Sequence, residues 1–262
     1  MTVESKIEIT KSKHKVTAAI LAGGLGTRLR SVVADRPKVM AEVRGRPFLC
    51  YLLDNLVSVN VTEVVLCTGY LGEQVQASFG NTYKSLRLVY SQESSQLGTA
   101  GALRLALPFF QSETVLVTNG DSFCDADLSA FMKWHFARQA EASLLLTHVS
   151  DTKRFGRVEV DDNGQVLSFE EKGNSSGMGS INAGIYLLSR NLLSTIPGDR
   201  PVSLEREIFP NWIDRGLYGY PSHGRFLDIG TPDSYEIAEK FFTTVPPLAP
   251  PYKRHREVKK LM

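Results

Sequence analysis

The chain has 262 residues, of which 42% are hydrophobic and 22% are charged, and its formal net charge is +2. This suffices for one large domain or two small ones around a real core, and the weak charge argues against nucleic acid as a partner. The sequence has neither a membrane-spanning apolar run nor a signal peptide, and its three cysteines lack C-x-x-C spacing, so we expect a cytoplasmic protein without structural zinc.

Short apolar runs alternate with helix-like stretches over residues 16–150, after a polar and presumed loose extension at 1–15. Such alternation predicts right-handed crossovers in an α/β fold, with a doubly wound, mostly parallel sheet and helices on both faces. Ligands bind such sheets at the carboxyl ends of the strands. The expected strands are "TAAILAG", "EVVLCTGY", "LRLVYSQ", "TVLVTNGD" and "ASLLLTHV", and the expected helices are "RPFLCYLLDNLVSVNV", "GEQVQASFG", "TAGALRLALPFF" and "DLSAFMKWHFARQA".

The pattern changes near residue 150. "GRVEVDDNGQVLSFEEK" predicts a β-hairpin, "SINAGIYLLS" a strand, and "LEREIFPNWIDRG" a helix. A strand-like piece then leads into a last helix, which Thr231 or Asp233 could cap. We therefore expect one domain over 16–243, with halves at about 16–150 and 151–243. A proline-rich, basic tail follows over 244–262 and could dock on a neighbouring molecule.

The segment "AAILAGGLGTRLR" joins a short apolar run to a glycine turn and arginines. Leu29 stands where the dinucleotide pattern G-x-G-x-x-G needs its third glycine, and the Gly-Lys-Ser/Thr of a Walker loop is absent. Backbone N–H groups of the turn and the guanidinium of Arg28 suit anionic oxygens. A tight corner without a ligand is the alternative.

Three charged residues stand at positions that suit phosphate chemistry. Lys38 follows the rigid Pro37 and suits an α-phosphate, although a solvated surface lysine has the same pattern. Asp121 ends an apolar strand and suits Mg²⁺, unless it caps the next helix. Asp228 lies between apolar residues and needs a partner, either a metal ion shared with Asp121 or an arginine such as Arg225.

The stretch "SFEEKG" adds a further cation. In a strand Glu170 and Lys172 point to the same face, so Lys172 could bind a second phosphate while Glu170 orients it or reads a hydroxyl. A solvated edge strand has the same pattern. Cationic phosphate binders with a split carboxylate site predict metal-assisted phosphoryl-group chemistry. The residues of this set are Arg28, Lys38, Lys172, Asp121 and Asp228.

With these motifs the chain resembles the sugar-1-phosphate nucleotidyltransferases. The matching stretches follow the family's order: "LAGGLGTRL" with Pro37-Lys38, "LGTAGAL", "NGDSF", "FEEK", "NAGIY" and "LDIGTP". The resemblance is greatest to the short branch with the guanylyltransferases for mannose-1-phosphate and for D-glycero-α-D-manno-heptose-1-phosphate. The hexapeptide repeats of the C-terminal β-helix in some relatives are missing after residue 240, so acetyltransferase activity is not implied.

The resemblance implies a Rossmann-like, glycosyltransferase-A-like sheet and the reaction of a nucleoside triphosphate with a sugar-1-phosphate. The sugar phosphate oxygen attacks the α-phosphorus in line, and pyrophosphate leaves. Arg28, Lys38, Asp121 and Asp228 are implied as catalytic residues, and the two aspartates as ligands of Mg²⁺. The implied nucleotide-binding residues are Leu21, Ala22, Gly23, Gly24, Gly26, Thr27, Glu93, Gly98 and Thr99. The implied sugar-phosphate residues are Glu170, Lys172, Asn182, Gly184 and Glu205.

Glu93 bears on the choice of base. By the resemblance it faces the base edge, where thymidylyl- and uridylyl-transferring relatives have glutamine. A carboxylate only accepts hydrogen bonds, and guanine offers two adjacent donors, so we predict GTP, with heptose-1-phosphate as the favoured sugar. The alternative acceptors are mannose-1-phosphate, or glucose-1-phosphate with dTTP or UTP as the nucleotide. In a separate alternative, Glu93 points to solvent and backbone groups read the base.

Two other function classes fit the sequence less well. A catalytically silent relative that regulates a partner would be expected to have lost Lys38, Asp121 or Asp228, and all three are present. A nicotinamide oxidoreductase would need the third fingerprint glycine and an acidic residue after the second strand, where the chain has "CTGY". A homo-oligomer is compatible with the sequence.

Overall fold

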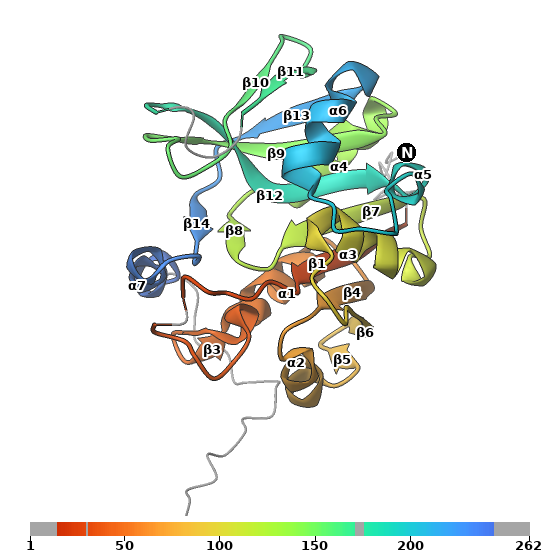
Figure 1. The fold of residues 1–262 in the computed structure, drawn as a ribbon. Coiled ribbons are helices and arrows are strands. Elements are labelled where there is room, and N and C mark those ends of the chain that lie inside the picture. Colours follow the sequence, from red (N-terminus) through yellow and green to blue (C-terminus); the bar gives the residue numbers. More distant parts are fainter. Residues whose placement is uncertain (1–14, 30, 171–175, 244–262) are drawn as a thin grey trace, which may run out of the picture.

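A single mixed sheet forms the centre of the computed structural model, which describes residues 15–29, 31–170 and 176–243 (Figure 1). The eight strands lie in the order β13-β9-β12-β7-β1-β4-β6-β5. Their bounds are Val16–Ala22 (β1), Glu63–Thr68 (β4), Thr82–Tyr83 (β5), Leu86–Gln92 (β6), Thr114–Asn119 (β7), Ala142–Val149 (β9), Gly179–Ser189 (β12) and Leu217–Ser222 (β13).

The sheet is mostly parallel. Strand β1 pairs in parallel with β4 and β7, as does β4 with β6 and β13 with β9. Strand β12 lies antiparallel between β7 and β9, and the short β5 is antiparallel to β6. The predicted doubly wound α/β fold is confirmed, whereas no feature of the sequence distinguished the direction of β12.

Helices cover both faces because the strands bury side chains on both faces. In β4, Val64 and Leu66 belong to one core and Val65 and Cys67 to the other, as the alternation of side chains along a strand requires. The first core contains residues of α1 (Phe48–Ser58), α2 (Gly72–Phe79), α4 (Leu128–Ala137) and α7 (Pro232–Phe241). The second contains residues of α3 (Gly98–Ala106), α5 (Arg190–Ser194) and α6 (Phe209–Trp212).

Three short strand pairs lie beside the main sheet. Strands β2 (Glu42–Val43) and β3 (Arg46–Pro47) form a small hairpin before α1. The hairpin predicted around Asp-Asn-Gly is confirmed as β10 (Val158–Val160) and β11 (Val166–Phe169). Strand β8 (Ser122–Cys124) pairs antiparallel with β14 (Phe226–Asp228), which brings residues far apart in the sequence together.

The prediction of one continuous helix for "LEREIFPNWIDRG" is wrong. The segment forms a π-helical turn at Leu204–Ile208, then α6, then a 3-10 turn at Ile213–Arg215. Pro210 interrupts the hydrogen-bond ladder because it has no N–H, and it is tolerated in the first turn of a new helix.

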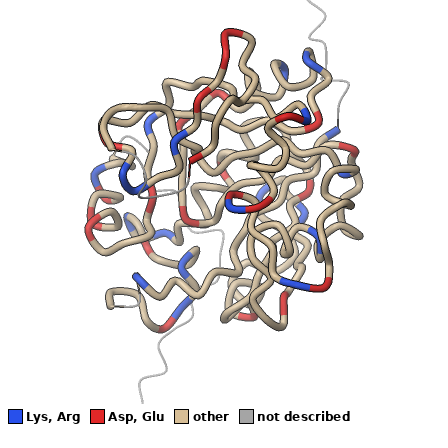
Figure 2. Tube along the Cα trace, turned by 45° about the horizontal axis from the view of Figure 1, so that its top comes forward, with Lys and Arg blue, Asp and Glu red and all other residues tan. Residues whose placement is uncertain are grey.

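Positive and negative residues are interspersed along the chain in Figure 2, in keeping with the small net charge. None of the helices within the described ranges is long and apolar enough to cross a membrane. The expected tail and all but Lys15 of the expected N-terminal extension lie outside the described residues.

Candidate active site

A cavity of about 810 Å³ opens where β1, β6 and β7 end, at the edge of the sheet where the topology predicts a ligand. Gly26, Thr27 and Glu170 are described but do not line it, and Lys172 lies outside the described residues. The other predicted site residues all lie in its wall: Leu21, Ala22, Gly23, Gly24, Arg28, Lys38, Glu93, Gly98, Thr99, Asp121, Asn182, Gly184, Glu205 and Asp228.

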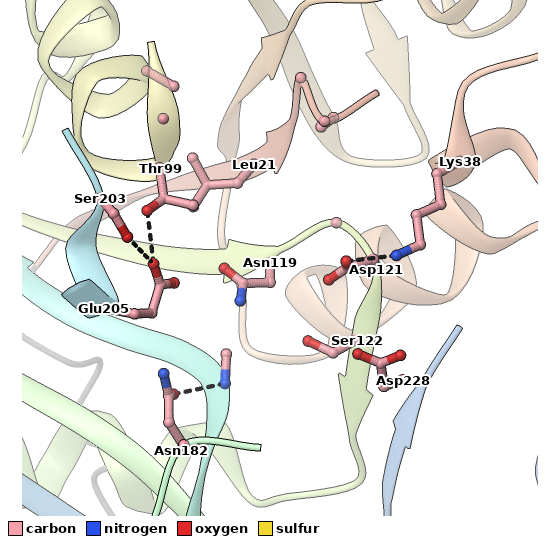
Figure 3. Close-up of a pocket in the computed structure, with 18 of the residues that line it drawn as sticks. Leu21, Lys38, Thr99, Asn119, Asp121, Ser122, Asn182, Ser203, Glu205 and Asp228 are labelled. Atoms are coloured by element: carbon pink, nitrogen blue, oxygen red, sulfur yellow. Dashed lines mark hydrogen bonds and ion pairs between the residues drawn. The ribbon is translucent and has the colours of Figure 1, made fainter. Parts of the chain in front are cut away.

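Asp121 and Asp228 meet because β8 and β14 pair. Asp228 lies opposite Ser122 in that pair, and the N–H of Ile229 donates to the carbonyl oxygen of Asp121 at 2.8 Å. Figure 3 shows both carboxylates in one corner of the cavity, together with Lys38. The structure thus brings together two residues that are more than one hundred positions apart and for which the sequence suggested a shared metal ion.

Lys38 is held against Asp121. Its Nζ lies 2.7 Å from Asp121 Oδ2, and its side chain is 12% exposed, which excludes a solvated surface lysine. Pro37 directs the chain into this position, since it precedes the 3-10 turn at Lys38–Met40. Asp121 is not a helix cap either, because Asp127 caps α4 by accepting from the N–H of Ala130.

The arginine beside Asp228 is Arg154 and not Arg225. Arg225 pairs with Asp125 at 3.0 Å, so its suggested bridge to Asp228 is wrong. The nearest recorded cation is Arg154, whose Nη2 lies 3.9 Å from Asp228 Oδ1. The same oxygen accepts the N–H of Gly230 at 2.6 Å.

The carboxylates of Asp121 and Asp228 are ligands of the type that Mg²⁺ prefers, but two carboxylates fill only part of its coordination sphere. Both offer hard oxygen ligands, and Mg²⁺ characteristically uses one or two protein carboxylates together with water and substrate phosphates. No larger group of His, Cys, Asp or Glu suited to a metal gathers in the described part of the chain. A site of this kind would therefore be completed by the triphosphate.

Glu93 lies against the glycine turn and not in solvent. A Cβ on Gly23 would lie 2.5 Å from Glu93 Oε1, so a larger residue at position 23 would displace this carboxylate. The second oxygen, Oε2, accepts the N–H of Leu97 at 3.0 Å. Burial raises the pKa of the Glu93 carboxyl above its ordinary value, although the bond from Leu97 opposes this shift. The alternative of a solvent-facing Glu93 is therefore wrong.

Glu205 links Thr99, a predicted nucleotide-binding residue, to Asn182, a predicted sugar-binding residue. Its Oε2 accepts hydrogen bonds from Thr99 Oγ1 at 2.8 Å and from Ser203 Oγ at 3.0 Å (Figure 3). Its Oε1 accepts from the hydroxyl of Tyr186 at 3.3 Å, and Tyr186 in turn accepts from Asn182 Nδ2 at 2.9 Å. Burial raises the pKa of Tyr186, so its hydroxyl keeps its proton and remains a donor.

Two glycines of the motifs are required by the backbone. Gly98 and Gly184 both have φ of 74°, in the left-handed region that favours glycine. A Cβ on Gly98 would lie 2.5 Å from the carbonyl oxygen of Val202, and one on Gly184 would lie 2.7 Å from Ser122 Oγ. These glycines let the walls of the cavity approach each other closely.

Several lining residues were not anticipated from the sequence. Asn119 and Ser122 flank Asp121, so the motif "NGDS" already held their signal. The aromatic residues Phe155 and Phe226 carry no such signal, because they meet only through tertiary packing, with ring centroids 5.3 Å apart. The unanticipated lining residues include Asn119, Ser122, Phe155, Gly156, Phe169, Ser203, Arg206 and Phe226.

A family model for nucleotidyl transferases matches residues 17–245. The chain belongs to the nucleotidyl transferase family. This nucleotidyltransferase is 36% identical over 224 residues to a D-glycero-alpha-D-manno-heptose 1-phosphate guanylyltransferase from Aneurinibacillus thermoaerophilus, over 85% of this chain and 96% of that protein. It is also 36% identical over 226 residues to a mannose-1-phosphate guanylyltransferase from Mycobacterium tuberculosis, over 85% of this chain but only 63% of the length of that relative.

The fold of the nucleotidyltransferase is similar to that of HddC from Yersinia pseudotuberculosis. The two superpose with a TM-score of 0.75 at 31% identity, over 87% of this chain and 99% of the other, and HddC has also been solved in complex with GMP-PN. The resemblance to sugar-1-phosphate nucleotidyltransferases and the glycosyltransferase-A-like fold class are thereby confirmed.

Proposed function

We propose that this nucleotidyltransferase transfers GMP from GTP to a manno-configured sugar-1-phosphate, with D-glycero-α-D-manno-heptose-1-phosphate as the preferred acceptor, and releases pyrophosphate. The observation that carries the choice of base is the carboxylate of Glu93 in the cavity wall beside Gly23. The heptose is supported by the relative that this chain matches over 96% of its length.

The acceptor pattern of Glu93 favours guanine over a pyrimidine. Guanine presents N1–H and its 2-amino group side by side, and an ionised carboxylate offers about four acceptor sites on two oxygens. The N–H of Leu97 occupies one site on Oε2, so each oxygen can still accept a bond from the base. Uracil or thymine would set a carbonyl against the carboxylate, at a cost of about 1–3 kcal/mol for the mismatched pair.

The phosphates would be held by charge and by backbone donors. We assign the β- and γ-phosphates to the glycine turn at Gly23 and Gly24 with Arg28, and the α-phosphate to Lys38. A Mg²⁺ ion bound by Asp121 and Asp228 would supply Lewis-acid stabilisation of phosphate charge. Lys38 Nζ lies 2.7 Å from Asp121 Oδ2, which supports a role of its ammonium group in stabilising charge on the α-phosphate.

The sugar side would be read by fixed acceptors. Glu205 is oriented by three hydroxyl donors, and the side-chain oxygen Oδ1 of Asn182 accepts the N–H of Gly184 at 2.9 Å. Such preorganised groups can bind sugar hydroxyls without paying to reorient. We further propose that Lys172 binds the sugar phosphate and that Glu170 supports it. The phosphate oxygen then attacks the α-phosphorus opposite the departing pyrophosphate.

We also propose a cytoplasmic site of action. Cys50, Cys67 and Cys124 are all buried and free, as expected where thiols remain reduced. The proposal about substrates is tested by measuring pyrophosphate release with ATP, GTP, CTP, UTP and dTTP against heptose-, mannose- and glucose-1-phosphate. We expect the highest kcat/KM for GTP with a manno-configured acceptor. A preference for dTTP or UTP with glucose-1-phosphate would contradict the proposal.

A further inference from the structure

Arg154 connects two parts of the chain that are distant in sequence. It lies between β9 and β10, and its Nη2 contacts the segment that leads from β14 into α7. The distances are 3.2 Å to Thr231 Oγ1, 3.5 Å to Ser234 Oγ and 3.9 Å to Asp228 Oδ1. A single guanidinium thus reaches both the cap of α7 and a carboxylate of the proposed metal site.

The residues that follow Arg154 form part of the cavity wall. Phe155 and Gly156 both line the cavity. Phe155 packs edge-on against Phe226 of β14 at 5.3 Å, and the carbonyl oxygen of Gly156 accepts the N–H of Asn182 at 3.2 Å. The segment therefore borders the sugar side of the cavity while Arg154 anchors it to the segment at Asp228.

The contacts of Asp228 explain why the anchor matters for geometry. Gly230 N–H and Arg154 both approach Oδ1 of Asp228, whereas no hydrogen-bond donor to Oδ2 is found in the described part of the chain. Arg154 is 48% exposed, so its ion pair contributes little to folding stability.

We propose that Arg154 is a positioning residue. It fixes the Phe155–Gly156 wall of the sugar subsite to the segment that carries Asp228, so that the sugar phosphate and the metal-binding carboxylate keep a fixed separation. The part of this inference that concerns the metal rests on the proposed role of Asp228. A small displacement of either group would lower the fraction of productive complexes, because the reacting atoms must be aligned closely.

The test compares Arg154→Met with a matched control, Arg225→Met. Arg225 also holds α7, through the carbonyl oxygen of Phe241 at 3.4 Å, but pairs with Asp125 and lies outside the cavity wall. For each variant the measurements are Tm, kcat, the KM of both substrates, and the affinity for mannose-1-phosphate in metal-free buffer by calorimetry.

We expect Arg154→Met to raise the KM for the sugar-1-phosphate about ten-fold and to lower kcat, with the KM for GTP within about two-fold of the wild type. The metal-free affinity for mannose-1-phosphate should fall in parallel, and Arg154→Lys should recover part of the loss. Arg225→Met should match the wild type in every kinetic constant, at a Tm similar to that of Arg154→Met.

Equal kinetic losses in Arg154→Met and Arg225→Met would mean that Arg154 only docks α7, which would overturn the inference. Unchanged sugar affinity in Arg154→Met would overturn it too, and so would unchanged affinity in Arg154→Lys if the Met variant fails to fold. The metal assignment is judged separately: if Asp228→Asn keeps Mg²⁺-dependent turnover, the proposed role of Asp228 fails, while the metal-free affinity still reports on Arg154.

Discussion

At the scale of single residues, the two carboxylates of the proposed metal site have different surroundings. Asp121 is 39% exposed and is paired with Lys38, whereas Asp228 is 14% exposed and accepts the N–H of Gly230. An ion that bridges them must therefore share Asp121 with an ammonium group.

Removing either charge should abolish most of the turnover. Asp121→Asn and Asp228→Asn keep the side-chain volume, so the fold should persist while kcat falls by about two orders of magnitude or more. Turnover is measured across a Mg²⁺ titration, with Asp125→Asn as the control, because Asp125 pairs with Arg225 outside the cavity wall. Near-normal turnover of either variant at limiting Mg²⁺ would exclude that residue as a ligand.

Glu93 allows a second prediction at this scale. In Glu93→Gln one acceptor oxygen becomes a donor amide, which opposes the donors of guanine and suits a pyrimidine. We expect kcat/KM for GTP to fall about ten- to a hundred-fold and the gap to UTP and dTTP to narrow. The ranking of GTP, ATP, CTP, UTP and dTTP by kcat/KM is measured for the wild type and for Glu93→Gln. An unchanged ranking would show that backbone groups read the base.

At the scale of elements, the start of a helix is set by a capping side chain, and the sequence contains several candidate capping residues near the start of α4. Asp125, Asp127 and Ser129 all stand near the start of α4, and only Asp127 caps it. At α7 the expected cap Thr231 is confirmed, with Ser234 completing a capping box. The choice among neighbouring candidates depends on which residue has extended φ and ψ directly before the first turn.

Substitution of the α4 cap should affect stability alone. Asp127→Ala leaves the N–H of Ala130 without its side-chain acceptor, so the free energy of unfolding should fall by about 1 kcal/mol. In the control, Ser129→Ala, the free energy of unfolding should change by no more than about 0.5 kcal/mol. Both values come from denaturant unfolding, and kcat should be unchanged in both variants. Equal destabilisation would contradict the assignment of the cap.

At the scale of the whole molecule, one sheet separates two cores, and adjacent residues of one strand serve different cores. In β9, Leu144 belongs to the core with α3 and α6, and Leu145 to the core with α1 and α4. Both side chains are fully buried. The cavity lies at the ends of strands of this sheet, so the strands that border it are packed by a core on each face.

Both cores should contribute comparably to stability. Leu144→Ala and Leu145→Ala should each lower the free energy of unfolding by about 2–5 kcal/mol, the range for buried leucines whose removal leaves a cavity. The exposed Leu167 provides the control, since its side chain is 60% exposed and Leu167→Ala should cost less than about 0.5 kcal/mol. Denaturant unfolding measures all three. If the free energy of unfolding falls by about 2–5 kcal/mol in one variant but hardly changes in the other, the prediction of comparable contributions is contradicted.

The sequence by itself determined the alternation of strands and helices, the glycine turn, and the charged residue types that we propose for binding phosphate and metal. These features are local: apolar periodicity, the conformational range of glycine, and the charge of a side chain after a strand do not depend on distant residues. The family match followed from the same motifs in order. For these reasons the sequence predicted the fold class, which is confirmed, and named many of the residues that line the cavity, whose roles remain proposals.

Only the tertiary structure decided which of these residues meet. The partner of Asp228 is Arg154 and not Arg225, because the pairing of β8 with β14 and the position of α7 set the distances. The antiparallel direction of β12, the engagement of Glu93 by Leu97, and the three hydroxyl donors around Glu205 also arise from chain segments far apart in sequence or from loop geometry. Such contacts depend on how packed elements lie relative to one another, which no local pattern encodes.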